Sequence, residues 1–248
     1  MKKSWVANTA TATNGFFGAL SILMTIEGVF DYAAVCILVS MVADFMDGRI
    51  ARALHTTGPL GVELDSMCDD ISFGIAPGAL LYAAELRDLG LVGMIACALL
   101  AVSCAFRLAR FNVKSDEVHG YFEGLPCPMT GMITAGYILS GARLWPFITL
   151  FLVLLVAYLM VSEIHYPTNK GASADQLHIE ALGIALLVLI IPTFFHWPAW
   201  FAALCLAFIV FGILNTYMNK RKMERRRRRK ALRRRMEEAE REDDYTEI

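Results

Sequence analysis

Four aspartates interrupt apolar stretches of the sequence: Asp44, Asp47, Asp65 and Asp69. Inside a membrane each carboxylate costs about 2.5 to 3.5 kcal/mol on insertion scales unless a cation compensates its charge. Carboxylate oxygens are preferred ligands of hard cations such as Mg²⁺ or Mn²⁺. Two such ions can bridge the oxygens of a diphosphate and neutralise charge on a leaving group. The aspartates therefore predict a site for two divalent cations that acts on a diphosphate.

Small and basic residues accompany the aspartates at helical spacing. Gly48 and Ala51 leave one helix face bare, so a nucleotide base and ribose could approach the backbone closely. Arg52 offers a bidentate fork for a phosphate or a base edge. Gly61 would relieve crowding where two helices meet. Solvated acids at helix ends would not require these partners, so the pattern favours recognition of a nucleotide diphosphate at a membrane surface.

The composition is that of a polytopic helical membrane protein, because 56% of the 248 residues are hydrophobic and only 19% are charged. We expect an all-α fold with about eight transmembrane helices. Their predicted positions are near 12–28, 32–54, 62–84, 91–111, 127–142, 145–162, 179–195 and 198–218. The last two could instead form one broken segment.

Basic residues predict the orientation of the chain. More than half of the 23 Lys and Arg residues lie at or beyond Lys220. With Lys2 and Lys3 inside and an even number of crossings, this basic tail also lies on the cytoplasmic side. The tail indicates a segment that fixes topology, with binding to anionic lipid as an alternative. The six cysteines are scattered singly, which favours small buried side chains over metal or redox chemistry.

The turn at 56–61 is short and rich in helix breakers. We therefore expect the helices near 32–54 and 62–84 to be antiparallel neighbours. Their carboxylates would then converge at the cytoplasmic side of the membrane.

The pattern Asp44-x2-Asp47-Gly48-x2-Ala51-Arg52-x8-Gly61-x3-Asp65-x3-Asp69 resembles, without a departure, the motif of the CDP-alcohol phosphotransferase family. Other segments resemble its phosphatidylserine synthase branch: Asn8-x2-Thr11-x2-Asn14-x3-Gly18, Ser72-Phe73-Gly74-x-Ala76-Pro77, Arg107-Leu108-Ala109-Arg110-Phe111-Asn112 and Gly124-Leu125-Pro126-x-Pro128. The similarity extends over roughly residues 8–167.

This resemblance implies a six-helix catalytic core in residues 1–167, usually a homodimer, followed by two additional transmembrane helices in 168–218 and a charged cytoplasmic tail in 219–248. It implies transfer of a phosphatidyl group from CDP-diacylglycerol to L-serine, which yields phosphatidylserine and CMP. Asp44, Asp47, Asp65 and Asp69 would be the metal ligands, and Asp69 would also take the proton from serine. The expected contacts to the CDP-lipid are Asn8, Thr11, Gly48, Ala51, Arg52 and Gly61.

Arg107 and Arg110 lie three residues apart near the cytoplasmic end of the helix expected at 91–111, so they could share a face. We expect Arg110 to hold the serine carboxylate, with Arg107 as the alternative and Ser72 helping to shape the pocket. Snorkelling to lipid headgroups, or pairing with Asp70 or Glu63, would also explain the two arginines. Asp70 itself is interpreted as a supporting or surface group.

Two other functions stay open. A relative within the same family would use another acceptor alcohol or an archaeal ether-lipid donor. A divalent-cation transporter would also carry carboxylates inside the membrane. The expected partners are CDP-diacylglycerol, L-serine, membrane lipids and a second copy of the chain, without nucleic acid. The expected location is a prokaryotic cytoplasmic membrane, with the active site on its cytoplasmic side.

Overall fold

The computed structural model describes residues 3–54, 58–114, 121–162 and 164–167. This part of the chain is helical apart from two short strands. Its α-helices are α1 (Lys3–Ile26), α2 (Phe30–Leu54), α3 (Pro59–Asp69), α4 (Ala76–Leu81), α5 (Leu91–Lys114), α6 (Cys127–Leu139) and α7 (Pro146–Val161). The six helical segments expected between 12 and 162 are confirmed, although their ends differ. The segments expected at 168–218 and the tail at 219–248 lie outside the described residues.

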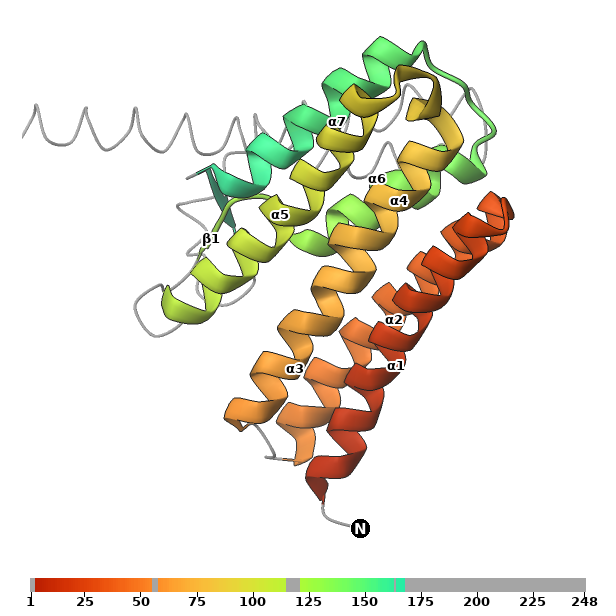
Figure 1. The fold of residues 1–248 in the computed structure, drawn as a ribbon. Coiled ribbons are helices and arrows are strands. Elements are labelled where there is room, and N and C mark those ends of the chain that lie inside the picture. The colour runs from red at the N-terminus through yellow and green to blue at the C-terminus, as the bar shows by residue number, and fades with distance from the viewer. Residues whose placement is uncertain (1–2, 55–57, 115–120, 163, 168–248) are drawn as a thin grey trace, which may run out of the picture.

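The third expected helix is one rod of changing helical type (Figure 1). It runs from α3 through the π-helix η1 (Asp70–Ile75), α4, the π-helix η2 (Tyr82–Leu86) and the 3₁₀ turn η3 (Arg87–Leu89). At the end of η1 the Ala76 N–H donates to the Ile71 carbonyl, five residues back. Pro77 follows and has no N–H to donate. Because a π turn takes extra residues, side chains after Asp69 are rotated relative to a regular α-helix.

An antiparallel pair of short strands was not expected from the sequence. β1 (Tyr121–Glu123) pairs with β2 (His165–Pro167), with Phe122 opposite Tyr166. Strands of three residues are too short to carry a recognisable alternation of apolar and polar side chains. The pair joins the segment before α6 to the segment after α7.

The helices pack as two connected groups (Figure 1). α1 packs along α2 and also against α3 and η1, whereas α5 pairs with α7 and α6 packs on α2. One buried cluster includes Phe73, Leu100 and Met160, and a second includes Ile37 and Leu80. The rod from α3 to η2 contributes to both clusters and therefore connects the two groups.

Large apolar side chains cover much of the outside of the described helices. Phe16 is 62% exposed, Val102 64% and Phe151 63%. Soluble monomers rarely expose apolar surface on this scale, so these faces suit a lipid environment. Within the described residues, Asn8–Ile26 and Leu91–Val113 are long and apolar enough to cross a membrane, whereas α6 and α7 are apolar but shorter. The count of eight spans stays a prediction.

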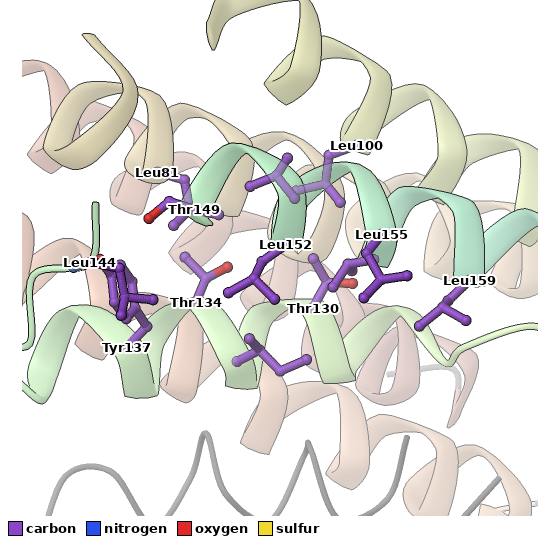
Figure 2. Close-up of a pocket in the computed structure, with 13 residues that line it drawn as sticks. Leu81, Leu100, Thr130, Thr134, Tyr137, Leu144, Thr149, Leu152, Leu155 and Leu159 are labelled. Carbon is purple, nitrogen blue, oxygen red and sulfur yellow. The ribbon is translucent and has the colours of Figure 1, made fainter. Parts of the chain in front are cut away.

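An apolar cavity of about 230 Å³ lies between α6 and α7 and reaches α5 (Figure 2). Leu100, Leu152, Leu155 and Leu159 are among its lining residues, together with the methyl-bearing Thr134. None of the four aspartates lines this cavity, so the chemistry predicted above lies elsewhere in the bundle.

Candidate active site

Three carboxylates from two helices converge in the structure. Asp44 and Asp47 lie on α2, and Asp65 lies on α3. One oxygen from each of the three lies within 4.8 Å of the others. Asp44 and Asp47 lie in the second half of α2, and α2 ends at the same end of the bundle at which α1 and α3 begin (Figure 1). The convergence expected from the short turn is therefore present for these three aspartates.

The helices that carry them are arranged around α1. Among the described residues, α1 packs against both α2 and α3, whereas α2 and α3 make little direct backbone contact. The helix expected near 62–84 nevertheless lies beside α2, because its later parts η1 and α4 contact α2. α1 holds the two helices in place, and their side chains meet across the space between them.

The donor set fits a hard divalent cation. Asp47 is only 4% exposed, and its Oδ2 has no hydrogen-bond partner among the described residues. The Oδ1 of Asp65 is also buried without such a partner. A buried carboxylate oxygen without a partner is costly, and a bound cation would remove that cost. The three aspartates offer the oxygen ligands that Mg²⁺ and Mn²⁺ prefer.

Asp69 lies beside this cluster, at the end of α3. It is 8% exposed, and its Oδ1 accepts a hydrogen bond of 2.9 Å from the Asn14 amide. Its carboxyl also lies within hydrogen-bonding reach of Asp44. Asp69 does not belong to the group of three whose oxygens lie within 4.8 Å, so its role as a fourth ligand stays a prediction.

α1 contributes a polar face to the site. Asn8, Thr11 and Asn14 follow one another at intervals of three residues and therefore share one side of the helix. Thr11 is 6% exposed and its side chain lies within hydrogen-bonding reach of Asp47. Asn8 Oδ1 lies 3.6 Å from the position that a Cβ would occupy on Gly61. Asn14 was expected only as part of a motif, although this polar stripe on an apolar helix is a signal that could have revealed it.

Ser72, expected near the serine pocket, has a different set of contacts. Its hydroxyl is fully buried and donates a hydrogen bond of 3.0 Å to the backbone carbonyl of Asn14. Gly18 faces it, since a Cβ there would stand 2.2 Å from Ser72 Oγ and 2.8 Å from Ser72 Cα. Ser40 on α2 donates to the same carbonyl at 3.1 Å. Asn14 thus ties α1 to α2 and η1, and a glycine allows the close approach.

The structure describes only some of the residues that we expect to contact the nucleotide. Gly48 follows Asp47 on α2 and is partly exposed. Ala51 and Arg52 continue α2, but their side chains lie outside the described part of the chain. Gly61 lies in the first turns of α3, beside Asn8. The structure therefore leaves the predicted contact of Arg52 with the nucleotide as a prediction.

Arg110, expected to hold the serine carboxylate, contacts the end of α7. Its guanidinium donates to the carbonyl oxygens of Val161 at 2.7 Å, Ser162 at 3.1 Å and Met160 at 3.3 Å. Carbonyls at the end of a helix have no helical partners, and a cation is favourable there. Arg110 therefore ties α5 to α7.

Arg107 faces the interior near the aspartates. It is 7% exposed, and its Nη1 donates to Cys127 Sγ at 3.5 Å. Its Nε has no hydrogen-bond partner among the described residues. Arg107 also lies close enough to Asp44 to act on that charge. Of the two arginines, Arg107 is the one with a buried donor available beside the site.

The fold and the site define a class: a helical protein with wide apolar outer faces and a cluster of three carboxylates, placed closely enough to hold a metal ion, at one end of its bundle. The family model for CDP-alcohol phosphatidyltransferase matches residues 4–163, and the chain belongs to this membrane-embedded family.

Three relatives illustrate the similarity. A Helicobacter pylori protein named CDP-diacylglycerol–serine O-phosphatidyltransferase is 34% identical over 194 residues, which cover 75% of this chain and 81% of the relative. A Methanocaldococcus jannaschii protein of the same name is 32% identical over 211 residues, or 85% of this chain and 93% of the relative. An archaetidylserine synthase of Methanothermobacter thermautotrophicus is 33% identical over 167 residues, or 65% and 69%.

Proposed function

We propose that this protein transfers the phosphatidyl group of CDP-diacylglycerol to the hydroxyl of L-serine, which yields phosphatidylserine and CMP. The observation that carries the proposal is the convergence of Asp44, Asp47 and Asp65 beside Asp69 in a chain of this family. The names of the relatives support serine as the acceptor.

Asp44, Asp47 and Asp65, with Asp69 as a further ligand, would hold two divalent cations, Mg²⁺ or Mn²⁺. When bound, such ions orient a diphosphate and neutralise the charge that develops on the departing CMP. The unpartnered oxygens of Asp47 and Asp65 support this assignment.

Asp69 would take the proton from the serine hydroxyl, because an alcohol is a weak nucleophile at its own pKa. The serine oxygen then forms a bond to the phosphorus that carries the lipid, and the bond from that phosphorus to the oxygen of CMP breaks. The bond from Asn14 to Oδ1 orients the carboxylate.

The nucleotide would lie against the ends of α1, α2 and α3. Thr11 lies beside Asp47 there, and Asn8 lies beside Gly61. Gly48 and Ala51 would leave the face of α2 free for the base and ribose. Arg52 would bind a phosphate with its guanidinium fork.

The proposals for oligomeric state, membrane location and domain organisation come from the sequence. We infer a homodimer in a prokaryotic cytoplasmic membrane, with the site on the cytoplasmic side. Residues 1–167 would form the catalytic core, followed by two helices in 168–218 and a cytoplasmic tail in 219–248. The donor could be a diacyl lipid or an archaeal ether lipid, since relatives carry both kinds of name.

The test is a reconstitution of the purified protein in detergent–lipid micelles with CDP-diacylglycerol, L-serine and Mg²⁺ or Mn²⁺. We expect phosphatidylserine and CMP in equal amounts, and neither product without serine. Asp69→Asn should remove the activity, whereas Asp88→Asn, an exposed carboxylate on η3, should keep it. Product from another alcohol but not from serine would contradict the proposed acceptor. Parallel assays with a CDP-activated ether lipid would identify the donor.

A further inference from the structure

A polar cleft lies at the end of the bundle away from the aspartates. Its volume is about 430 Å³, and it is lined by the turn between α1 and α2, by η2 and by the connection between α6 and α7 (Figure 1). α2 begins beside it at Phe30, whereas Asp44 lies roughly 20 Å further along that helix, at about 1.5 Å per residue. The cleft is therefore separate from the candidate active site.

The cleft holds charges of both signs. Asp31, Glu85 and Arg143 are among its lining residues. In the part of the chain that the structure describes, no ion pair joins these three groups to one another or to other side chains. Glu85 lies within hydrogen-bonding reach of the Tyr137 side chain. A concave surface with unpaired charges of both signs suits a ligand that is itself zwitterionic.

The apolar cavity of Figure 2 adjoins this cleft. Tyr137 lines the cavity, and its neighbour Ile138 lines the cleft. Leu144 lines the cavity, and its neighbour Arg143 lines the cleft. The Leu144 N–H donates a hydrogen bond of 3.0 Å to the Tyr137 hydroxyl, which holds this junction together. Figure 2 shows Tyr137 and Leu144 at one end of the cavity and Leu159 at the other, so the cavity extends from the cleft along α6 and α7.

A buried hydroxyl group lies near the junction. Thr149 is 3% exposed and lines the cavity. Its Oγ1 lies near the Tyr137 side chain but forms no hydrogen bond of ordinary geometry with a described residue. A buried hydroxyl without a full partner is costly, so it indicates that a polar group of a ligand comes close at this point.

Aromatic side chains place the cleft at the depth of lipid headgroups. Tyr32 lines it and is 67% exposed, and Trp145, which follows Arg143 closely in the chain, is 68% exposed. Tyr and Trp gather where the hydrocarbon of a membrane meets water. This end of the bundle therefore presents a charged cleft, then a hydroxyl group, then an apolar cavity. A phospholipid has the same order of headgroup, ester and acyl chain.

We propose that the cleft and the cavity together bind one zwitterionic phospholipid. Arg143 binds the phosphate, while Asp31 and Glu85 bind the ammonium group. Thr149 donates to an ester carbonyl, and an acyl chain fills the cavity. CDP-diacylglycerol does not suit this site, because the proposed function places its diphosphate at the aspartates, at the other end of the bundle.

The first test measures lipid binding to the unaltered protein after its own lipids have been removed in detergent. Phosphatidylethanolamine carries both charges, phosphatidylglycerol lacks the ammonium group, and glycerophosphoethanolamine lacks both acyl chains. Native mass spectrometry and melting curves report the affinity for each, because a ligand that binds the folded protein stabilises it. We expect phosphatidylethanolamine to bind about 10-fold more tightly than either of the others. If either of them binds as tightly, the proposal is overturned.

The second test changes each part of the site separately. Arg143→Gln and Thr149→Val should each weaken the binding of phosphatidylethanolamine about 3- to 10-fold. Val153→Phe should weaken it at least about 10-fold, because this buried residue lines the cavity and a larger side chain would occupy the place of the acyl chain. Arg87→Gln is the matched control, since this exposed arginine of η3 lines neither the cleft nor the cavity. Unchanged affinity in all three site variants would refute the lipid site.

The outcome is independent of the proposed function, because binding and melting are measured without turnover. A protein that makes no phosphatidylserine would still bind the lipid, and a failure of the lipid test would leave the proposed reaction in place. If Val153→Phe fails to fold, as judged by its melting in detergent, the two polar variants and the lipid series on the unaltered protein decide.

Discussion

Asn14 and Asp69 lie 55 positions apart in the chain, yet the Asn14 amide donates a hydrogen bond of 2.9 Å to the Asp69 carboxylate. The bond is buried, and it runs from the middle of α1 to the last residue of α3. Through it, a helix without acidic residues sets the direction of the carboxylate that we assign as the base. Hydrogen bonds to a charged group are stronger than those between neutral groups.

Replacing Asn14 should therefore affect the rate more than substrate binding. We expect Asn14→Ala to lower kcat about 10- to 100-fold, since a hydrogen bond to a charged group contributes about 1.5 to 3 kcal/mol. The backbone carbonyl that accepts from Ser40 and Ser72 remains in this variant. Steady-state assays at saturating serine measure the effect. Thr13→Ala removes a bond within α1 only and serves as the control. An unchanged kcat for Asn14→Ala would contradict the orienting role.

Metal dependence tests the carboxylate cluster. We expect a chelator to abolish activity and added Mg²⁺ or Mn²⁺ to restore it. Asp65→Asn should lower activity at least about 100-fold and raise the metal concentration needed for half-maximal activity, because a metal clamp contributes several kcal/mol to the transition state. Metal titration of both enzymes gives the comparison, with Asp88→Asn as the control. Full activity after exhaustive chelation would refute the metal site.

The close approach of α1 to η1 depends on Gly18. A Cβ at this position would stand 2.8 Å from the backbone Cα of Ser72, which cannot move aside as a flexible side chain would. We expect Gly18→Ala to lower stability by about 1 to 3 kcal/mol. Thermal melting in detergent measures it. Gly58→Ala is the matched control, since nothing lies within 4 Å of the added Cβ, and it should stay within about 0.5 kcal/mol of the original protein. Equal melting temperatures of the two variants would show that α1 can move away from η1 and make room for the added Cβ.

Replacing Arg110 tests two roles against each other. The sequence predicted that it binds the serine carboxylate, whereas its contacts indicate that it ties α5 to α7. If it ties α5 to α7, Arg110→Ala should lower stability by about 2 kcal/mol through lost bonds to helix-end carbonyls. The serine KM of the folded enzyme should then change little. If Arg110 held the serine carboxylate, the KM would instead rise about 10- to 100-fold. Melting curves and serine titrations of the same preparation separate the two, with Arg87→Ala as the control.

Much of the site was predictable because helical periodicity and a short turn are local properties. The spacing of Asp44 and Asp47, and that of Asp65 and Asp69, indicated that each pair shares one face of its helix, and the turn at 56–61 indicated that the two helix ends lie near each other. The six helical segments between 12 and 162 followed from apolar runs of sufficient length. These features depend on neighbours in the chain, so the sequence contains them directly.

The assignment of Arg107 and Arg110 could not be made in this way. Both lie near the same end of α5, and their spacing of three residues allows either to face the site. Only the packing of α7 against α5 places carbonyl oxygens around Arg110, among them that of Met160, which lies 50 residues later in the chain. Arg107 then lies beside Cys127. The direction of a long side chain depends on which partners the tertiary packing brings near it.

The amino-acid sequence alone indicated the kind of chemistry, because it places carboxylates in apolar helices at intervals that suit a nucleotide and divalent cations. Tertiary structure decided how the parts are held. It placed α1 against both α2 and α3, turned Asn14 toward Asp69, and introduced the π-helix after Asp69 that directs Asp70 toward α5. The reason is physical: periodicity is encoded by near neighbours, whereas a buried polar group finds its partner only when distant helices have packed together.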